Sequence, residues 1–119
     1  MSIQNRQLLT ATIASGASFS NTIDLSFHVL VGFVTPAAWT TAAIDIEVSI
    51  DGVNFFTNTY DSSGITTGIY LTPVVSSGYS VDALALIPYN FVRFRSGTTA
   101  VPVNQAAART ISVITRPFM

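Results

Sequence analysis

In the segment Ala43–Ile50, apolar and polar residues alternate without a break from Ile44 onward. A period of two is typical of a β-strand with one face on a hydrophobic core, since successive side chains point to opposite faces. Asp51-Gly52 follows directly and favours a two-residue type I′ turn, so we expect a hairpin with a return strand from Val53 to Tyr60. One face of the first strand is then apolar and the other polar: Ile44, Ile46, Val48 and Ile50 against Asp45, Glu47 and Ser49.

Similar short segments, separated by Gly, Pro, Asn and Asp, run along the whole chain. Strands are predicted at Gln7–Ile13, Phe19–Leu25, His28–Val34, Gly68–Val75, Tyr79–Val81, Phe91–Arg95 and Arg109–Thr115, with a turn at Asp61–Gly64. The continuous apolar run from His28 to Val34 indicates a central strand buried on both faces. A helical turn is expected within Val81–Ile87, ended by Pro88. The pattern predicts an all-β protein: one domain, residues 1–119, folded as an antiparallel, jelly-roll-like β-sandwich.

The surface of such a domain would carry unusually little charge. Charged residues make up 9% of the chain, against roughly 25% in an average domain. There is no lysine, although lysine commonly protects exposed sheet edges from pairing. Both deficits indicate that much of the surface is covered in the working state, as in a homo-oligomer or a lattice-bound subunit. A surface rich in Ser, Thr and Asn that is soluble without charge is the alternative.

Several classes of protein are disfavoured. The chain has no cysteine, so disulfides and thiolate chemistry are excluded. The net charge of −1 and the lack of a basic stripe argue against nucleic-acid binding. Met1–Thr10 lacks the basic start and apolar run of a signal peptide, and the longest apolar run, Val29–Val34, is too short to span a membrane.

The sequence offers no convincing catalytic, cofactor or metal site. His28 is the single histidine and lies within an apolar strand, where a packed residue is more common than a base or ligand. Asp45 and Glu47 project from one strand face and would suit a calcium site or a glycosidase pair. The solvent face of an amphipathic strand explains them more simply. We therefore expect a binding protein without enzymatic activity or cofactor.

Contact residues are easier to nominate. Arg93 and Arg95 share a strand face, and arginine is enriched at interfaces, so we expect salt bridges to a neighbouring subunit. Ser96–Ala108 is a long uncharged segment between two strands, which favours a contact arm over a loop that only closes one end of the sandwich. Trp39 lies in a loop and fits an interface anchor or a sugar-stacking platform, although burial in the core is slightly favoured. The predicted interface comprises Trp39, Arg93, Arg95, Val101, Pro102, Asn104, Gln105 and Arg109.

Two segments also carry a family resemblance. The first is Ile44–Tyr60, read as IDIEVSIDGVNFFTNTY. The second is Ile87–Pro117, with Pro-x-x-Phe, Val-Arg-Phe-Arg-Ser-Gly-Thr, Pro-Val-Asn-Gln, Ala-Ala-Arg-Thr-Ile and Thr-Arg-Pro in order. Together they resemble short virion proteins encoded in the structural operons of tailed bacteriophages, some of them head decoration (cement) proteins. The N-terminal third contributes no matching motif.

The resemblance implies a β-sandwich that is made in the host cytoplasm and attaches to the capsid surface as a homotrimer at local three-fold positions. The major capsid protein would then be its partner. Many weak contacts repeated by symmetry suit such a role, because avidity multiplies modest affinities. A tail, baseplate or fibre-associated virion module and a carbohydrate-binding module built on Trp39 remain the alternatives.

Overall fold

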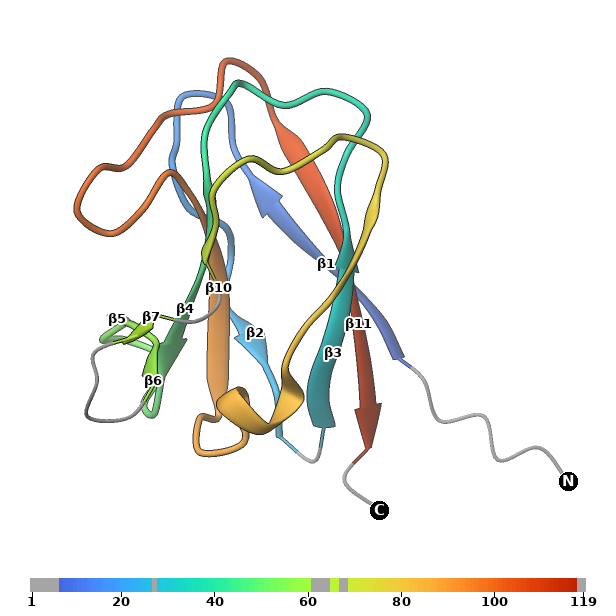
Figure 1. The fold of residues 1–119 in the computed structure, drawn as a ribbon, viewed down its shortest axis with the longest axis vertical. Coiled ribbons are helices and arrows are strands. Elements are labelled where there is room, and N and C mark those ends of the chain that lie inside the picture. The colour runs from blue at the N-terminus through green and yellow to red at the C-terminus, as the bar shows by residue number, and fades with distance from the viewer. Residues whose placement is uncertain (1–6, 27, 61–64, 67–68, 118–119) are drawn as a thin grey trace, which may run out of the picture.

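The alternating strands form two antiparallel sheets packed face to face in the computed structural model, which describes residues 7–26, 28–60, 65–66 and 69–117 (Figure 1). The first sheet has the order β1-β11-β3-β9 (Gln7–Ile13, Arg109–Pro117, His28–Val34 and Gly78–Ser80). The second has the order β2-β10-β4-β5 (Ile23–Asp24, Phe91–Ser96, Ile44–Ser49 and Phe56–Thr57), and β8 (Ile69–Tyr70) also pairs with β4. The predicted antiparallel β-sandwich is confirmed. Three predicted features lie wholly or partly outside the described residues: the start of the chain, the turn at 61–64 and the first residue of the 68–75 strand.

The core lies between the sheets and is built from the apolar half of each alternating strand. Phe33 of β3 is at its centre, with ring centroids 5.1 Å from Tyr70, 5.2 Å from Tyr79 and 5.2 Å from Phe94. Both sheets contribute to this aromatic group, so it joins them. The remaining buried apolar side chains surround it: Ala11, Ile13, Ile23, Leu25, Leu30, Ile44, Ile46, Val48, Leu86, Val92, Ile111 and Val113.

Strand β3 is buried mainly on one face, and the expectation of burial on both was wrong. Leu30 and Phe33 are buried, whereas Val29 and Val31 are half-buried and Val34 is exposed. No further layer covers the outer face of this sheet among the described residues. Gly32 allows β9 to approach closely, because a Cβ there would lie 2.8 Å from the Tyr79 carbonyl oxygen.

The hairpin after β4 exists, but its turn is wider than predicted. Val48 pairs with Phe56, and β4 ends at Ser49, so residues 50–55 connect the two strands. Asp51 accepts hydrogen bonds through Oδ1 from the backbone amides of Val53 and Asn54, each at 2.8 Å. Only Gly52 has a positive φ, +78°, whereas a type I′ turn needs two such residues. The return strand is also shorter than predicted. It ends as β5 at Thr57, and the two-stranded sheet of β6 (Thr59–Tyr60) and β7 (Ile65–Thr66) follows.

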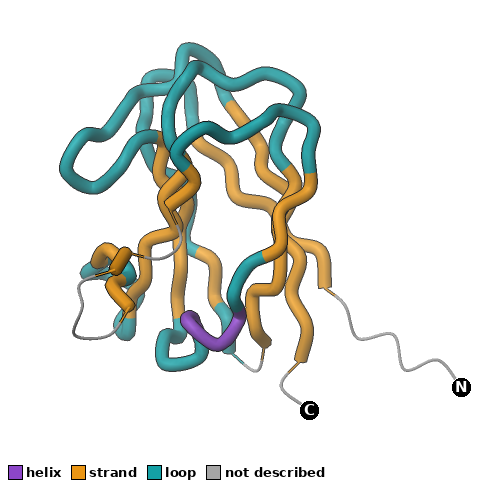
Figure 2. Tube along the Cα trace, in the orientation of Figure 1, coloured by secondary structure: helices purple, strands orange, loops and turns teal. Residues whose placement is uncertain are grey.

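The helical turn was predicted correctly. A 3₁₀ helix, η1, spans Ala83–Leu86, and Asp82 accepts a hydrogen bond from the Leu84 amide at its start. The longer loops gather at the opposite end of the sandwich, drawn at the top in Figure 2. Backbone hydrogen bonds tie these loops together, including Gly16 N–H to the Gln105 carbonyl (2.8 Å) and Thr35 N–H to the Ser77 carbonyl (2.9 Å).

Candidate assembly surfaces

A network of charged side chains covers the outer face of the second sheet. Arg93 and Arg95 of β10 lie opposite Glu47 and Asp45 of β4 in the strand register. Arg93 Nε donates to Glu47 Oε1 at 2.7 Å, and Arg95 Nε donates to Glu47 Oε2 at 2.6 Å. Glu47 is only 1% exposed, and Asp45 is fully buried. The sequence-based view that this strand face points to solvent was therefore wrong. The salt bridges that we expected between subunits form within the chain.

Two aromatic rings hold the Arg93 guanidinium in place. Its Cζ atom lies 4.1 Å from the centroid of the Phe19 ring and 4.2 Å from that of Phe55. Arg95 lies 5.2 Å from the Phe19 centroid and donates through Nη1 to Ser18 Oγ at 3.2 Å. Cation–π contacts of this kind strengthen when the pair is partly desolvated. The Arg93 side chain is 17% exposed, so it is largely but not wholly covered.

Thr99 connects the loop after β10 to this network. Its hydroxyl donates to Glu47 Oε2, and its backbone N–H donates to Asp45 Oδ2 at 3.3 Å. Thr57 Oγ1 of β5 donates to the Thr99 hydroxyl at 3.0 Å. Loop 97–108 therefore folds back onto the sheet of its own chain at this point.

The two carboxylates respond differently to the same surroundings. Burial raises the pKa of Asp45 and the neighbouring Glu47 raises it further, while the hydrogen bonds from Thr99 only partly oppose this. Asp45 Oδ1 is buried and accepts no hydrogen bond from the described residues. Burial also acts to raise the pKa of Glu47, but hydrogen bonds from Arg95, Thr99 and Arg93 outweigh it and hold that pKa below its usual value.

The tip of loop 97–108 is narrow and projects from the sandwich. Thr98 N–H donates to the Val101 carbonyl at 3.0 Å, and Gly97 pairs with Pro102 as an isolated bridge. Gly97 has a φ of +84°, and a Cβ there would lie 2.3 Å from the Val101 carbonyl oxygen. Val101 is 66% exposed, and Pro102 and Asn104 are also exposed. Their predicted contact role stays a prediction that suits their position.

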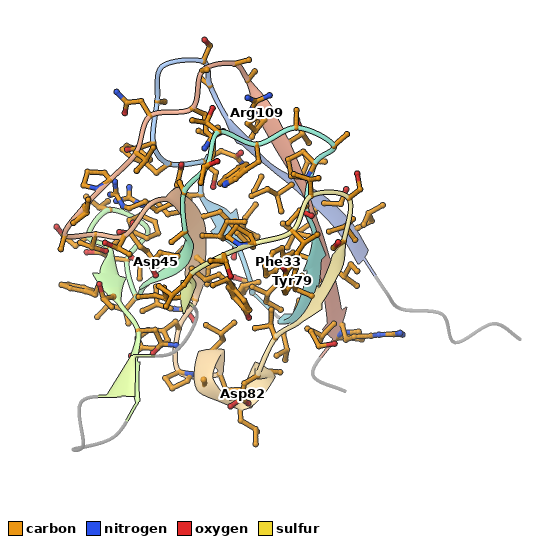
Figure 3. All side chains as sticks on the ribbon, turned by 45° about the horizontal axis from the view of Figure 1, so that its top comes forward. Phe33, Asp45, Tyr79, Asp82 and Arg109 are labelled. Atoms are coloured by element: carbon orange, nitrogen blue, oxygen red, sulfur yellow. The ribbon has the colours of Figure 1, made fainter. Side chains whose placement is uncertain are left out.

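Gln105 has a different role from the one predicted. It is 1% exposed, so it lies inside the loop end and does not present a contact surface. Its Oε1 accepts from the Thr40 amide at 2.8 Å, and its Nε2 donates to the Thr40 carbonyl at 3.0 Å and to Ser96 Oγ at 2.7 Å. Arg109 is half-buried and donates through Nε to Gln105 Oε1 at 3.1 Å; Figure 3 shows it at this end of the molecule. Gln105 and Arg109 therefore join loops 35–43 and 97–108.

Trp39 is half-buried and packs against the core, with its indole N–H donating to the Ala42 carbonyl at 3.1 Å. This agrees with the slight preference for burial. Trp39 also lines an open groove of about 260 Å³. The other residues that line this groove are Thr41, Ala42, Ala43, Leu71, Thr72, Pro73 and Val75.

The structure divides the eight predicted contact residues into three groups. Arg93 and Arg95 lie on the outer sheet face, while Trp39, Gln105 and Arg109 lie at the loop end. The exposed tip residues Val101, Pro102 and Asn104 form the third group. Sequence reasoning missed Phe19, Phe55 and Thr99. The sequence did contain a signal for the ion-pair network itself. In a chain with so little charge, Asp45 and Glu47 stand two residues apart on one strand, and Arg93 and Arg95 do so on another.

The remaining candidates are explained locally. His28 Nδ1 lies 3.2 Å from the Ser26 carbonyl oxygen, and the ring is half-buried. Within the described residues, no three His, Cys, Asp or Glu side chains come close enough together to hold a metal ion. No helix in the described part of the chain is long and apolar enough to cross a membrane.

Comparison with known proteins gives one informative result. No family model matches the chain, and no curated protein matches its sequence. Among solved structures, the crystal structure of SPBc2 prophage-derived protein YomS superimposes with a TM-score of 0.56 over 97% of this chain and 97% of that one. The two sequences are 12% identical, so this likeness establishes a shared fold.

Proposed function

We propose that this chain is a non-enzymatic structural protein of a bacteriophage particle. The observation that carries the proposal is the match over nearly the full length of both chains to a prophage-derived protein. The resemblance of Ile44–Tyr60 and Ile87–Pro117 to phage virion proteins supports it independently. At the sequence level that resemblance extends to head decoration proteins, so the specific role we propose is a cement protein on the outside of the capsid.

Exposed apolar side chains support a role in assembly. Charged residues make up only 9% of the chain, and several large apolar side chains are exposed. Those more than 60% exposed are Leu8, Ile50, Val53, Leu71, Leu84 and Val101. Isolated exposed apolar residues are ordinary on protein surfaces. In a chain with so few charges, however, a bound partner that covers several of them would remove that apolar surface from water and favour assembly.

The mechanism is mass action. A protein that binds only the assembled shell stabilises that shell by an amount that grows with the logarithm of its free concentration over Kd. We expect a homotrimer at local three-fold positions, where contacts with the major capsid protein repeat by symmetry and avidity multiplies them. The rigid sandwich and the projecting tip at Val101 suit contacts of this kind.

No enzymatic activity is proposed, because the charged groups that the fold brings together serve one another. Both oxygens of Glu47 accept arginine hydrogen bonds, and Asp45 is fully buried. A general acid or base needs access to a substrate proton, which neither carboxylate offers here.

Binding to particles tests the proposal. Purified protein is mixed with capsids assembled without it and sedimented, and the capsids are then heated. We expect saturable binding at a fixed number of copies per capsid and a higher temperature of capsid disruption. Absence of the protein from the capsid pellet at every concentration would contradict the proposal.

Two alternatives have their own tests. Binding to isolated tails rather than heads would favour the tail, baseplate or fibre-associated module. The groove beside Trp39 is the observation that favours a carbohydrate-binding module, since sugars stack on aromatic side chains. A change in Trp39 fluorescence with one member of a glycan panel would favour that function, and unchanged fluorescence across the panel would count against it.

A further inference from the structure

The outer face of the second sheet presents unused hydrogen-bond donors. Arg93 bonds to Glu47 through Nε alone, and no described residue accepts from its Nη1 or Nη2. Arg95 likewise uses Nε and Nη1, which leaves Nη2. The Arg93 and Arg95 side chains are 17% and 12% exposed, so part of each remains open to solvent. We call Phe19, Phe55, Arg93 and Arg95 the arginine face.

The arginines of this face reach solvent, whereas its carboxylates do not. Both guanidinium groups bond to one carboxylate, Glu47, which is 1% exposed. The second carboxylate, Asp45, is fully buried and bonds to Thr99 and to neither arginine. A negative group that approaches from solvent therefore meets the arginine donors first.

The arginine donors are already held in place. Glu47 holds the Nε atom of Arg93, and the Phe19 and Phe55 rings lie within about 4 Å of its guanidinium carbon. A side chain that is fixed before binding loses less conformational entropy when it binds. Partly buried arginines with aromatic neighbours also recur among the residues that dominate binding energies at protein interfaces.

We propose that the arginine face docks a carboxylate-bearing segment of the capsid shell protein. The carboxylate accepts from the free Nη groups of Arg93, a planar arrangement that favours two parallel hydrogen bonds. An apolar residue beside that acid covers the ring of Phe19, which is 45% exposed. This inference rests on the proposed capsid function and names the chemistry by which the capsid is recognised.

The test is binding to capsids assembled without the protein, with three variants. Arg93→Gln removes the guanidinium group and its positive charge, and we expect about 100-fold weaker binding, since truncating one partner of a desolvated charge pair has effects of this size. Arg116→Gln is the matched control: it removes the same charge from an exposed position on β11, and less than about a threefold change is expected. Glu47→Gln keeps both arginines but removes the carboxylate that holds Arg93, so an intermediate loss of about tenfold in binding is expected.

These variants separate recognition from folding. If Arg93 acts only by stabilising the sheet, Glu47→Gln and Arg93→Gln weaken binding alike, and the inference is overturned. Equal binding by Arg93→Gln and the wild type also overturns it while leaving the capsid function intact. If the wild type itself fails to bind, both proposals fall together.

Two further measurements do not depend on how well the variants fold. Wild-type binding should weaken by about tenfold between low and high salt, because added ions screen charge pairs at a partly exposed face. Salt-independent binding would contradict the inference. Light scattering on the free proteins tests whether the arginine face instead binds a second copy of this chain. If Arg93→Gln converts a wild-type oligomer to a monomer, the face contacts that second copy and the capsid assignment is overturned.

Discussion

Asp45 and Glu47 stand two residues apart on one buried strand face, yet their neutral variants should change stability in opposite directions. Replacing Glu47 with Gln leaves Arg93 and Arg95 without an anionic partner. Breaking a buried ion pair from one side destabilises proteins by about 3–5 kcal/mol. We expect Glu47→Gln to lower the free energy of unfolding by about 3 kcal/mol at pH 7, at the lower end of this range, because the amide oxygen of the introduced Gln still accepts one hydrogen bond. For a domain of this size that lowers Tm by about 12 °C.

Asp45→Asn should instead raise the free energy of unfolding by about 1 kcal/mol at pH 7. One buried oxygen of Asp45 has no partner among the described residues, and a neutral amide is less penalised there than a carboxylate. The exposed Asp82 gives the control, since Asn caps a helix start as well as Asp does, and Asp82→Asn should stay within about 0.5 kcal/mol of the wild type.

The pH dependence of the two variants follows from the directions of the pKa shifts. The pKa of Glu47 is lowered on folding, so its contribution is present above its unfolded value of 4.5 and is lost as pH falls through the folded pKa. The difference between Glu47→Gln and the wild type should therefore shrink in acid. The pKa of Asp45 is raised, so its ionisation lowers stability as pH rises above 3.8. The advantage of Asp45→Asn should appear only above that pH.

Urea unfolding monitored by Trp39 fluorescence measures these differences at pH 7 and pH 3. Trp39 is the single tryptophan and packs against the core, so its emission reports global unfolding. The reasoning would be refuted if Asp45→Asn destabilised the protein by more than about 1 kcal/mol at pH 7. It would also be refuted if Glu47→Gln left stability unchanged there.

Four further variants test how the loops and core are held. Gly97→Ala should destabilise the protein by about 2–3 kcal/mol in thermal unfolding, because φ is +84° and the new Cβ meets the Val101 carbonyl. Gly16→Ala is its control: φ is +80° but the space around it is open, so it should destabilise the protein by only about 1 kcal/mol. Gln105→Ala should destabilise by about 2–3 kcal/mol, since it leaves the Thr40 amide and carbonyl unpaired, and hydrogen exchange should speed up in loop 35–43. Phe33→Ala should destabilise by about 4 kcal/mol in urea unfolding, and a loss below about 1 kcal/mol would contradict its central place in the core.

The sequence predicted most of the strands because local apolar patterns determine them. Gln7–Ile13 and His28–Val34 were predicted with the bounds of β1 and β3. The turn at Asp51-Gly52 was not, because the Asp51 carboxylate accepts the amides of Val53 and Asn54 and so favours a wider turn. The outcome depended on which hydrogen bonds a single side chain makes, and the residue pair alone does not specify that.

The candidate site was harder to predict because it depends on strand pairing. Alternation shows that Asp45 and Glu47 share a face, but a polar face is indistinguishable from a solvent face until its neighbour is known. Here the neighbour is β10, which is far away in sequence and places Arg93 opposite Glu47. Thr99, from a loop with no periodicity, then covers the pair. The low overall charge led us to expect a surface covered by partners. Part of that charge, Asp45 and Glu47, is instead buried within the chain itself.

Locating the chain on the virus particle tests the central claim most directly. Cryo-electron microscopy of particles with and without this protein gives a difference map that shows every bound copy. We predict density on the outside of the capsid, three copies around each local three-fold position, with the sheet of β10 and β4 facing the shell. Density confined to the tail, or no difference between the two maps, would contradict the account.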